Sequence, residues 1–252
     1  MGREPIFEDF TFGQAEREVM DQDGHFVFPG LLTHTAQERL IESLSYIESI
    51  KPQGVEGHEP NRFAAEFDSY LESLIGHPQM LMLARSILGD EIRYDHCATL
   101  NRPGGNKGQP WHTHGYGEEN PALGFVRTFF YVNGFEPNDG GLKVVPGSHL
   151  FRERMDRADT DEILQAEWLQ GKVHPITGES LQVEALSVPS GTVITMWTFA
   201  AHGVNPRLPK SDTRWCVVYA YRNPGLPSRA RWISPEYEKR RISGAEGLLH
   251  LY

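Results

Sequence analysis

The fold is decided by a stretch whose polarity alternates with a period of two, EIRYDHCATLN at residues 91–101. Successive side chains of a β-strand point to opposite faces, so this alternation predicts a strand. The two sets that alternate are Ile92, Tyr94, His96, Ala98 and Leu100 on one side and Arg93, Asp95, Cys97, Thr99 and Asn101 on the other. Apolar residues before residue 91 recur at helical spacing instead, so the chain is predicted to change from helices to strands here.

Downstream of this stretch, further strands are predicted near residues 110–115, 124–133, 142–146, 181–188, 192–198 and 214–222. The segments 102–106, 137–141 and 189–191 are rich in residues that favour turns. Residues 151–175 interrupt the pattern with a helix expected around Asp161–Leu169. Many short strands separated by regular turns predict a barrel or a sandwich.

Upstream, the first 90 residues are predicted to be mostly helical, with one short strand between two turns at 23–32. Thr35 and Glu38 form a capping-box pattern that should begin the first helix. A second helix is expected from Phe63 to Ile75, and a third from Pro78 to Gly89. We therefore expect one domain over residues 1–252, with a helical buttress at about 33–89, a β core at about 91–223 and a tail at 224–252 packed over the barrel.

Composition limits the possible partners. The formal net charge of -10 argues against a nucleic-acid surface, which needs clustered Lys and Arg. No stretch approaches the roughly 18 apolar residues of a membrane span, and the N-terminus lacks an apolar leader. We expect a cytoplasmic protein that binds a small molecule, and the sequence does not indicate an oligomeric state. Cys97 and Cys216 lie in predicted strands and are expected to be buried free thiols.

Two of the 11 histidines stand apart from the rest. His112 and His114 are two residues apart in an extended segment, so their side chains leave the same face and could bind one metal ion. Local hydrogen bonding is expected at His34 and His149. Surface positions are expected for His25, His58, His77, His174 and His250.

A series of motifs surrounds the His-x-His segment. Trp111 precedes it, and the segment DGGLKVVPGSH follows at residues 139–149. His202-Gly203 comes later, and Arg214 follows twelve residues after His202. In this order, over residues 20–223, the sequence resembles the phytanoyl-CoA dioxygenase family of Fe(II)/2-oxoglutarate oxygenases.

The resemblance implies a double-stranded β-helix, that is, a cupin-like jelly roll, closed by helices. It implies that His112 and His202 bind iron on two facing strands, and that Fe(2+), 2-oxoglutarate and O2 take part in the reaction. It also implies that Arg214 binds the distal carboxylate of 2-oxoglutarate, for which a guanidinium is well suited. Asn101 and Tyr131 are further candidates for contacts with this cosubstrate, and Tyr116, Arg127 and Trp197 for the substrate pocket.

The sequence departs from the family at the third ligand. The usual motif is His-x-Asp, which gives two histidines and one carboxylate, whereas His114 occupies the carboxylate position here. His114 could be a ligand in a three-histidine site, or the carboxylate could come from Glu118 or Glu119. A small anion could instead fill the position, or the site could have decayed to a non-catalytic one.

Three functions remain open at this point. The leading hypothesis is a 2-oxoglutarate-dependent oxygenase of a small polar metabolite, which would release succinate and CO2. The second is a three-histidine dioxygenase of the cupin kind that does not use 2-oxoglutarate. The third is a metal-binding homologue without turnover.

Overall fold

The computed structural model describes residues 4–114, 123–155, 157–227 and 231–251. Its nine named strands form two antiparallel sheets, a larger one in the order β1-β7-β4-β9-β2 and a smaller one in the order β3-β8-β5-β6. The strands are β1 (His25–Phe28), β2 (Arg93–Thr99), β3 (Gln109–His112), β4 (Phe125–Tyr131), β5 (Leu142–Val144), β6 (Glu184–Ala185), β7 (Thr192–Trp197), β8 (His202–Val204) and β9 (Cys216–Arg222).

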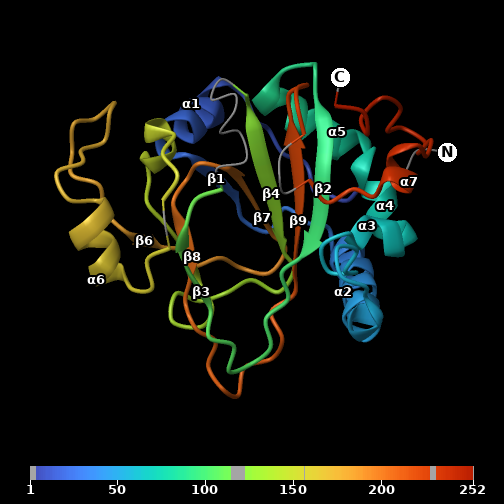
Figure 1. The fold of residues 1–252 in the computed structure, drawn as a ribbon, viewed down its shortest axis with the longest axis horizontal. Helices are drawn as coiled ribbons and strands as arrows, with labels where there is room; N and C mark the ends of the chain where they lie inside the picture. The colour runs from blue at the N-terminus through green and yellow to red at the C-terminus, as the bar shows by residue number, and fades with distance from the viewer. Residues whose placement is uncertain (1–3, 115–122, 156, 228–230, 252) are drawn as a thin grey trace.

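From β2 to β9 the chain passes repeatedly between the two sheets. β2, β4, β7 and β9 belong to the larger sheet, and β3, β5, β6 and β8 to the smaller one. This winding is that of a double-stranded β-helix, which confirms the predicted fold class. Figure 1 shows the larger sheet at the centre, with β3, β6 and β8 on one side and helices on the other.

The predicted helical buttress covers the outer face of the larger sheet (Figure 1). Val126 and Phe130 of β4 pack with the helices, whereas Phe129 and Tyr131 face the smaller sheet. Because both faces of the sheet are covered, β4 and β9 are buried along their whole length. The helices are α1 (Gln14–Asp23), α2 (His34–Ile50), η1 (Lys51–Gln53), α3 (Ala64–Phe67), α4 (Ser69–Ile75), α5 (Pro78–Leu88), η2 (Ser148–Phe151), α6 (Asp161–Ile163), η3 (Leu164–Trp168) and α7 (Pro235–Glu238).

Two predicted helix boundaries were wrong. Helix α2 begins two residues earlier than expected, because Thr33 and not Thr35 accepts a hydrogen bond from the backbone N–H of Ala36, at 3.2 Å. The helix expected from Phe63 to Ile75 is two short helices, because Asp68 takes an extended conformation between them. The Asp68 side chain accepts from the Leu71 N–H at 2.8 Å and so caps the second helix.

Strand β2 does not keep its two predicted sets of residues on opposite faces. Its pairing with β9 shifts between Tyr94 and His96, which marks a β-bulge. Tyr94 and Cys97 therefore both pack with the helices, although they belong to different sets, while Ala98 faces the smaller sheet. The bulge also brings His96 into contact with Arg127 of β4, which lies on the inner face of the larger sheet.

The C-terminal residues 231–251 pack against the barrel and the helices. Tyr237, Leu248 and Leu249 are buried with the helices, and the carbonyl of Leu248 accepts from the Tyr94 N–H at 2.8 Å. The Trp232 ring lies 4.7 Å from that of His96, between ring centroids. Within the described ranges, no helix combines the length and the apolar character needed to span a bilayer.

Both cysteines are buried and free, as predicted. Burial raises the pKa of Cys97 and that of Cys216 to about 12, which keeps both thiols protonated and poorly nucleophilic. We expect neither to react with a thiol reagent in the native protein at pH 8, and both to react once guanidinium unfolds the chain. Rapid labelling of a thiol under native conditions would contradict this packing.

Candidate metal centre

Three histidines converge between the two strands at the edge of the smaller sheet. His112 ends β3 and pairs with His202, which begins β8, while His114 follows two residues beyond the end of β3. One ring nitrogen of each lies within 4.8 Å of the others. The ring centroids are 4.3 Å apart for His112 and His202, 4.6 Å for His112 and His114, and 4.9 Å for His114 and His202.

The protein fixes the orientation of two of these rings. Nδ1 of His112 lies 2.9 Å from the Pro110 carbonyl, and Nδ1 of His202 lies 2.9 Å from the Ala200 carbonyl. A carbonyl only accepts, so each Nδ1–H donates and each Nε2 keeps its lone pair for a metal ion. Burial lowers the pKa of His112 to about 4 and holds the pKa of His202 well below its usual range, so both rings are neutral at pH 7.

His114 is held differently. NH1 of Arg127 lies 2.7 Å from its Nε2, and because a guanidinium only donates, this Nε2 accepts. Burial and the charge of Arg127 hold the pKa of His114 well below its usual range. A neutral imidazole has one lone pair. His114 can therefore bind a metal ion only if Arg127 moves away from Nε2 or if the proton on Nδ1 is lost.

A buried chain of polar groups extends from Arg127 into the larger sheet. NH2 of Arg127 lies 3.4 Å from Nε2 of His96, whose Nδ1 is 2.7 Å from Asp95 Oδ2. Arg222 NH1 lies 3.7 Å from the other Asp95 oxygen. All four side chains are buried, and Asp95 and His96 are fully so. No role was predicted for Asp95 or His96, and Asp95 lies where the pairing of β2 with β9 shifts.

Arg214 lies deep between the sheets, only 1% exposed. Its guanidinium carbon is 5.3 Å from the centre of the Tyr131 ring and 5.8 Å from that of Phe135. Its Nε and NH1 have no hydrogen-bond partner among the described residues. Buried guanidinium donors without an acceptor are costly, and an anion such as a carboxylate is the group that they are suited to bind. Gly140, in the segment 139–149, leaves space for the two neighbouring arginine side chains. A Cβ at this position would lie 3.3 Å from Arg214 NH1 and 2.4 Å from Arg207 Cδ.

The remaining predicted residues are placed as follows. Tyr131 lies beside Arg214, and Arg127 beside His114. The Asn101 amide accepts from the Cys216 N–H and donates to Glu48, both at 3.1 Å, so both of its ends are engaged within the protein. Tyr116, Glu118 and Glu119 lie outside the described residues.

Trp197 is not brought together with the three histidines. It pairs with Val126 on the helix-facing side of the larger sheet, whereas its neighbour Met196 faces the barrel interior. There it lies under the Arg17 guanidinium, 5.7 Å from the ring centre, in a cavity of about 350 Å³. Phe199 and Arg152 line the same cavity.

Three histidines expected at the surface are buried instead: His25, His77 and His174. His77 Nε2 lies 3.1 Å from the Glu4 carbonyl, and His174 Nε2 lies 3.0 Å from the Gln22 carbonyl. Each thus ties together segments far apart in sequence, which the local sequence around a histidine does not reveal.

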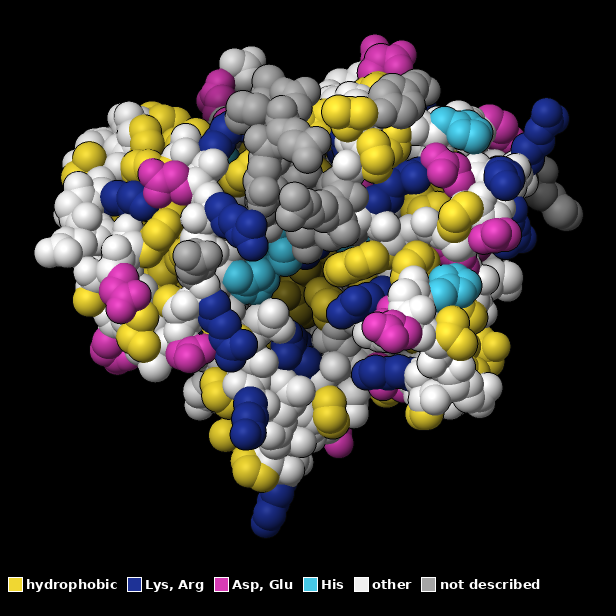
Figure 2. All heavy atoms as spheres, viewed as in Figure 1, with side chains coloured by type: hydrophobic (Ala, Val, Ile, Leu, Met, Phe, Trp, Pro, Cys, Tyr) yellow, Lys and Arg dark blue, Asp and Glu magenta, His cyan; other side chains and the backbone are white. Residues whose placement is uncertain are grey.

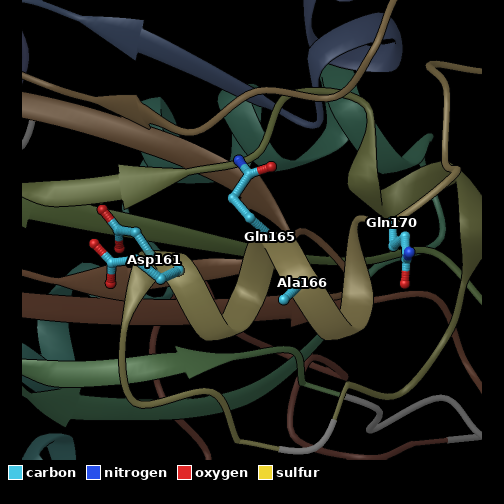
Figure 3. A pocket seen from close by; sticks show the side chains of 5 residues that line it. Asp161, Gln165, Ala166 and Gln170 are labelled. Atoms are coloured by element: carbon cyan, nitrogen blue, oxygen red, sulfur yellow. The ribbon is translucent and has the colours of Figure 1, made fainter.

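The surface of the molecule has two notable depressions. Figure 2 shows a hollow in one face of the molecule, with histidine side chains at its margin and lysine or arginine side chains around it. A second, open depression lies along α6 and η3 and has a volume of about 630 Å³. Figure 3 shows Asp161, Gln165 and Gln170 among the side chains that line it. Asp161 accepts from Trp111 Nε1 at 2.7 Å, so this helical segment braces the residue next to His112.

The fold is that of a group of solved structures that includes metal-bound enzymes. No family model and no curated protein matches the sequence. EctD from S. alaskensis with bound Fe has a TM-score of 0.67 at 18% identity, covering 94% of this chain and 88% of that one. HygX from Streptomyces hygroscopicus with nickel and 2-oxoglutarate bound has a TM-score of 0.64 at 14% identity, covering 86% and 89%. SnoK, a non-heme alpha ketoglutarate dependent carbocyclase from nogalamycin biosynthesis, has a TM-score of 0.65 at 16% identity, covering 91% of each chain. At these identities the likeness establishes the shared jelly-roll fold.

Proposed function

We propose that this protein is an Fe(II)- and 2-oxoglutarate-dependent oxygenase of a small metabolite, related to the phytanoyl-CoA dioxygenase family. The observation that carries the proposal is the buried Arg214. Two of its nitrogens have no hydrogen-bond acceptor among the described residues, and it lies in the same barrel as the converging histidines. The iron and 2-oxoglutarate bound to the structural neighbours support it.

The donor set fits iron. His112 and His202 present Nε2 lone pairs from rings held by backbone carbonyls, and imidazole is a good ligand for iron. His114 is the proposed third ligand. When bound, iron and 2-oxoglutarate would supply oxidising power through O2 reduction, with succinate and CO2 as products.

The chain's own residues would orient the cosubstrate and keep water out. Arg214 would hold the distal carboxylate through its Nε and NH1, and the Tyr131 and Phe135 rings flank that guanidinium. The low-polarity surroundings strengthen such an ion pair, because water cannot compete for the carboxylate. Arg127, beside His114, is the candidate for a contact with the substrate, which would be a small metabolite of a biosynthetic pathway.

The proposal is tested by titrating 2-oxoglutarate into the anaerobic Fe(II) protein and then admitting O2. We expect a weak visible absorption band on titration and slow succinate release without substrate. Arg214→Met should raise the half-saturating 2-oxoglutarate concentration by roughly 10- to 100-fold, the value of a hydrogen bond to a charged group. Iron content should not change. Arg157→Met, at an exposed arginine, is the matched control. An iron-replete protein with neither band nor succinate would contradict the proposal.

A three-histidine dioxygenase that binds its substrate directly at iron is the second candidate, favoured by the position of His114 beside His112 and His202. For that enzyme, 2-oxoglutarate would cause no absorption band, and Arg214→Met would leave turnover unchanged. A metal-binding protein without turnover would take up iron, but it would neither release succinate from 2-oxoglutarate nor oxidise a substrate bound directly at iron.

A further inference from the structure

Arg102 lies directly opposite Arg214 on neighbouring extended segments. The Arg102 N–H donates to the Arg214 carbonyl at 2.9 Å, and the Arg214 N–H donates to the Arg102 carbonyl at 2.9 Å. Residues paired in this way have Cα atoms about 5.5 Å apart. Like charges at such positions repel each other, so this pair destabilises the protein unless something compensates for it.

No carboxylate of the described residues forms an ion pair with either arginine. The nearby Arg207 does have one, since its NH1 lies 3.0 Å from Asp139 Oδ2. Within the part of the chain that the structure describes, the guanidinium of Arg102 donates to uncharged acceptors, namely Asn106 Oδ1, the Gly108 carbonyl and Gln109 Oε1, each at 3.1 Å. Its Nε has no partner within the described ranges, as is the case for Nε and NH1 of Arg214.

The charges of the two arginines also act on each other and on a shared neighbour. The charge of Arg214 lowers the pKa of Arg102, second to burial. Burial raises the pKa of Tyr131, and the charges of Arg214 and Arg102 oppose that rise. These effects agree with the cross-strand pairing, which places the two arginines side by side.

We propose that Arg102 and Arg214 form a two-arginine site that binds a carboxylate group of a dicarboxylic acid, and that this site works without metal. The naming of 2-oxoglutarate as that acid rests on the proposed function. A carboxylate placed between two guanidinium groups would satisfy the open donors and remove the repulsion between them. Arg102 is thus a positioning and specificity residue for the cosubstrate, beyond the single arginine that the family resemblance implied.

The test uses the full chain stripped of metal with EDTA. Glutarate, which lacks the 2-oxo group needed for chelation, should raise the midpoint of thermal unfolding and bind with a measurable heat in calorimetry. Glutaramide, its uncharged diamide, should do neither. A midpoint that glutarate does not shift, or shifts no more than glutaramide, overturns the proposal.

Variants of Arg102 then test whether this residue contributes to the binding of glutarate. Arg102→Met should raise the Kd of glutarate about tenfold, the value of one charge-assisted hydrogen bond, and Arg102→Lys should raise it less. Gln109→Ala is the matched control, because it removes a hydrogen bond from the same turn but keeps the charge, and it should leave the Kd within about threefold. Equal glutarate affinity in Arg102→Met and the parent protein, or an equal loss in Gln109→Ala, would overturn the role of Arg102.

These measurements involve no iron, O2 or turnover. Failure of the 2-oxoglutarate-dependent oxidation would therefore leave the binding result standing. Conversely, loss of glutarate binding in a protein that still releases succinate would contradict only the two-arginine site.

Discussion

Replacing His202 with alanine should lower the affinity of the protein for Fe(II) by more than roughly 1000-fold. Removing a residue that only orients a metal ligand already lowers metal affinity by about 10- to 100-fold, and His202 is proposed as a ligand itself. His202 presents its Nε2 from a ring that the Ala200 carbonyl fixes, and it pairs with His112 across β3 and β8. Without His202, the two remaining imidazoles, those of His112 and His114, both come from the segment at the end of β3. The neighbouring strand β8 then provides no ligand. Iron content after reconstitution and gel filtration measures the loss.

The control for this variant is His250→Ala, at an exposed histidine near the C-terminus. It should bind iron as the parent protein does. Thermal unfolding of metal-free His202→Ala should show a cooperative transition, since only one buried ring at the start of β8 has been removed. If folded His202→Ala retained stoichiometric iron at micromolar concentrations, His202 would not be a ligand and the metal centre would have to lie elsewhere.

The sequence predicted the elements whose periodicity extends over enough residues. Helix α5, with Pro78 at its start and Gly89 after its end, and the long strands β4 and β9 are examples. Strand β8 was not among the strand ranges predicted from periodicity, because its three residues are too few to show a period, and only the family resemblance placed His202 on a strand. Helix α1 was missed because only Met20 is buried along it, so it has no apolar stripe that a sequence pattern can reveal.

In the candidate site too, some residues were predicted from the sequence and others were not. His112 and His202 were identified from motifs, and the structure brings them together as a cross-strand pair. The contacts of His96 with Asp95 and Arg127 depend on a bulge, and alternation alone cannot show where a strand gains a residue. Trp197 faces the helices because of the register between β7 and β4, which the sequence of either strand does not specify.

Replacing His114 separates the possible identities of the third ligand. If His114 binds iron, His114→Ala should weaken Fe(II) binding by more than about 100-fold, since it removes a ligand itself. His114→Asp should bind iron about as well as the parent protein, because a carboxylate restores the two-histidine, one-carboxylate set and can also accept from Arg127. Competition with a calibrated chelator measures both affinities.

A variant of Arg127 provides a second test of whether His114 binds iron. Its guanidinium engages Nε2 of His114 at 2.7 Å, so iron and Arg127 compete for the same imidazole. Arg127→Met should then tighten Fe(II) binding by about tenfold or more, because it frees the lone pair and removes a positive charge that costs a nearby dication a few kcal/mol at an effective dielectric of about 20. In Arg127→Met combined with His114→Ala, the gain from the freed lone pair should disappear. Unchanged iron affinity in His114→Ala would instead show that His114 serves only as the acceptor for Arg127. The protein would then bind iron through His112 and His202 alone, and another ligand would occupy the third position.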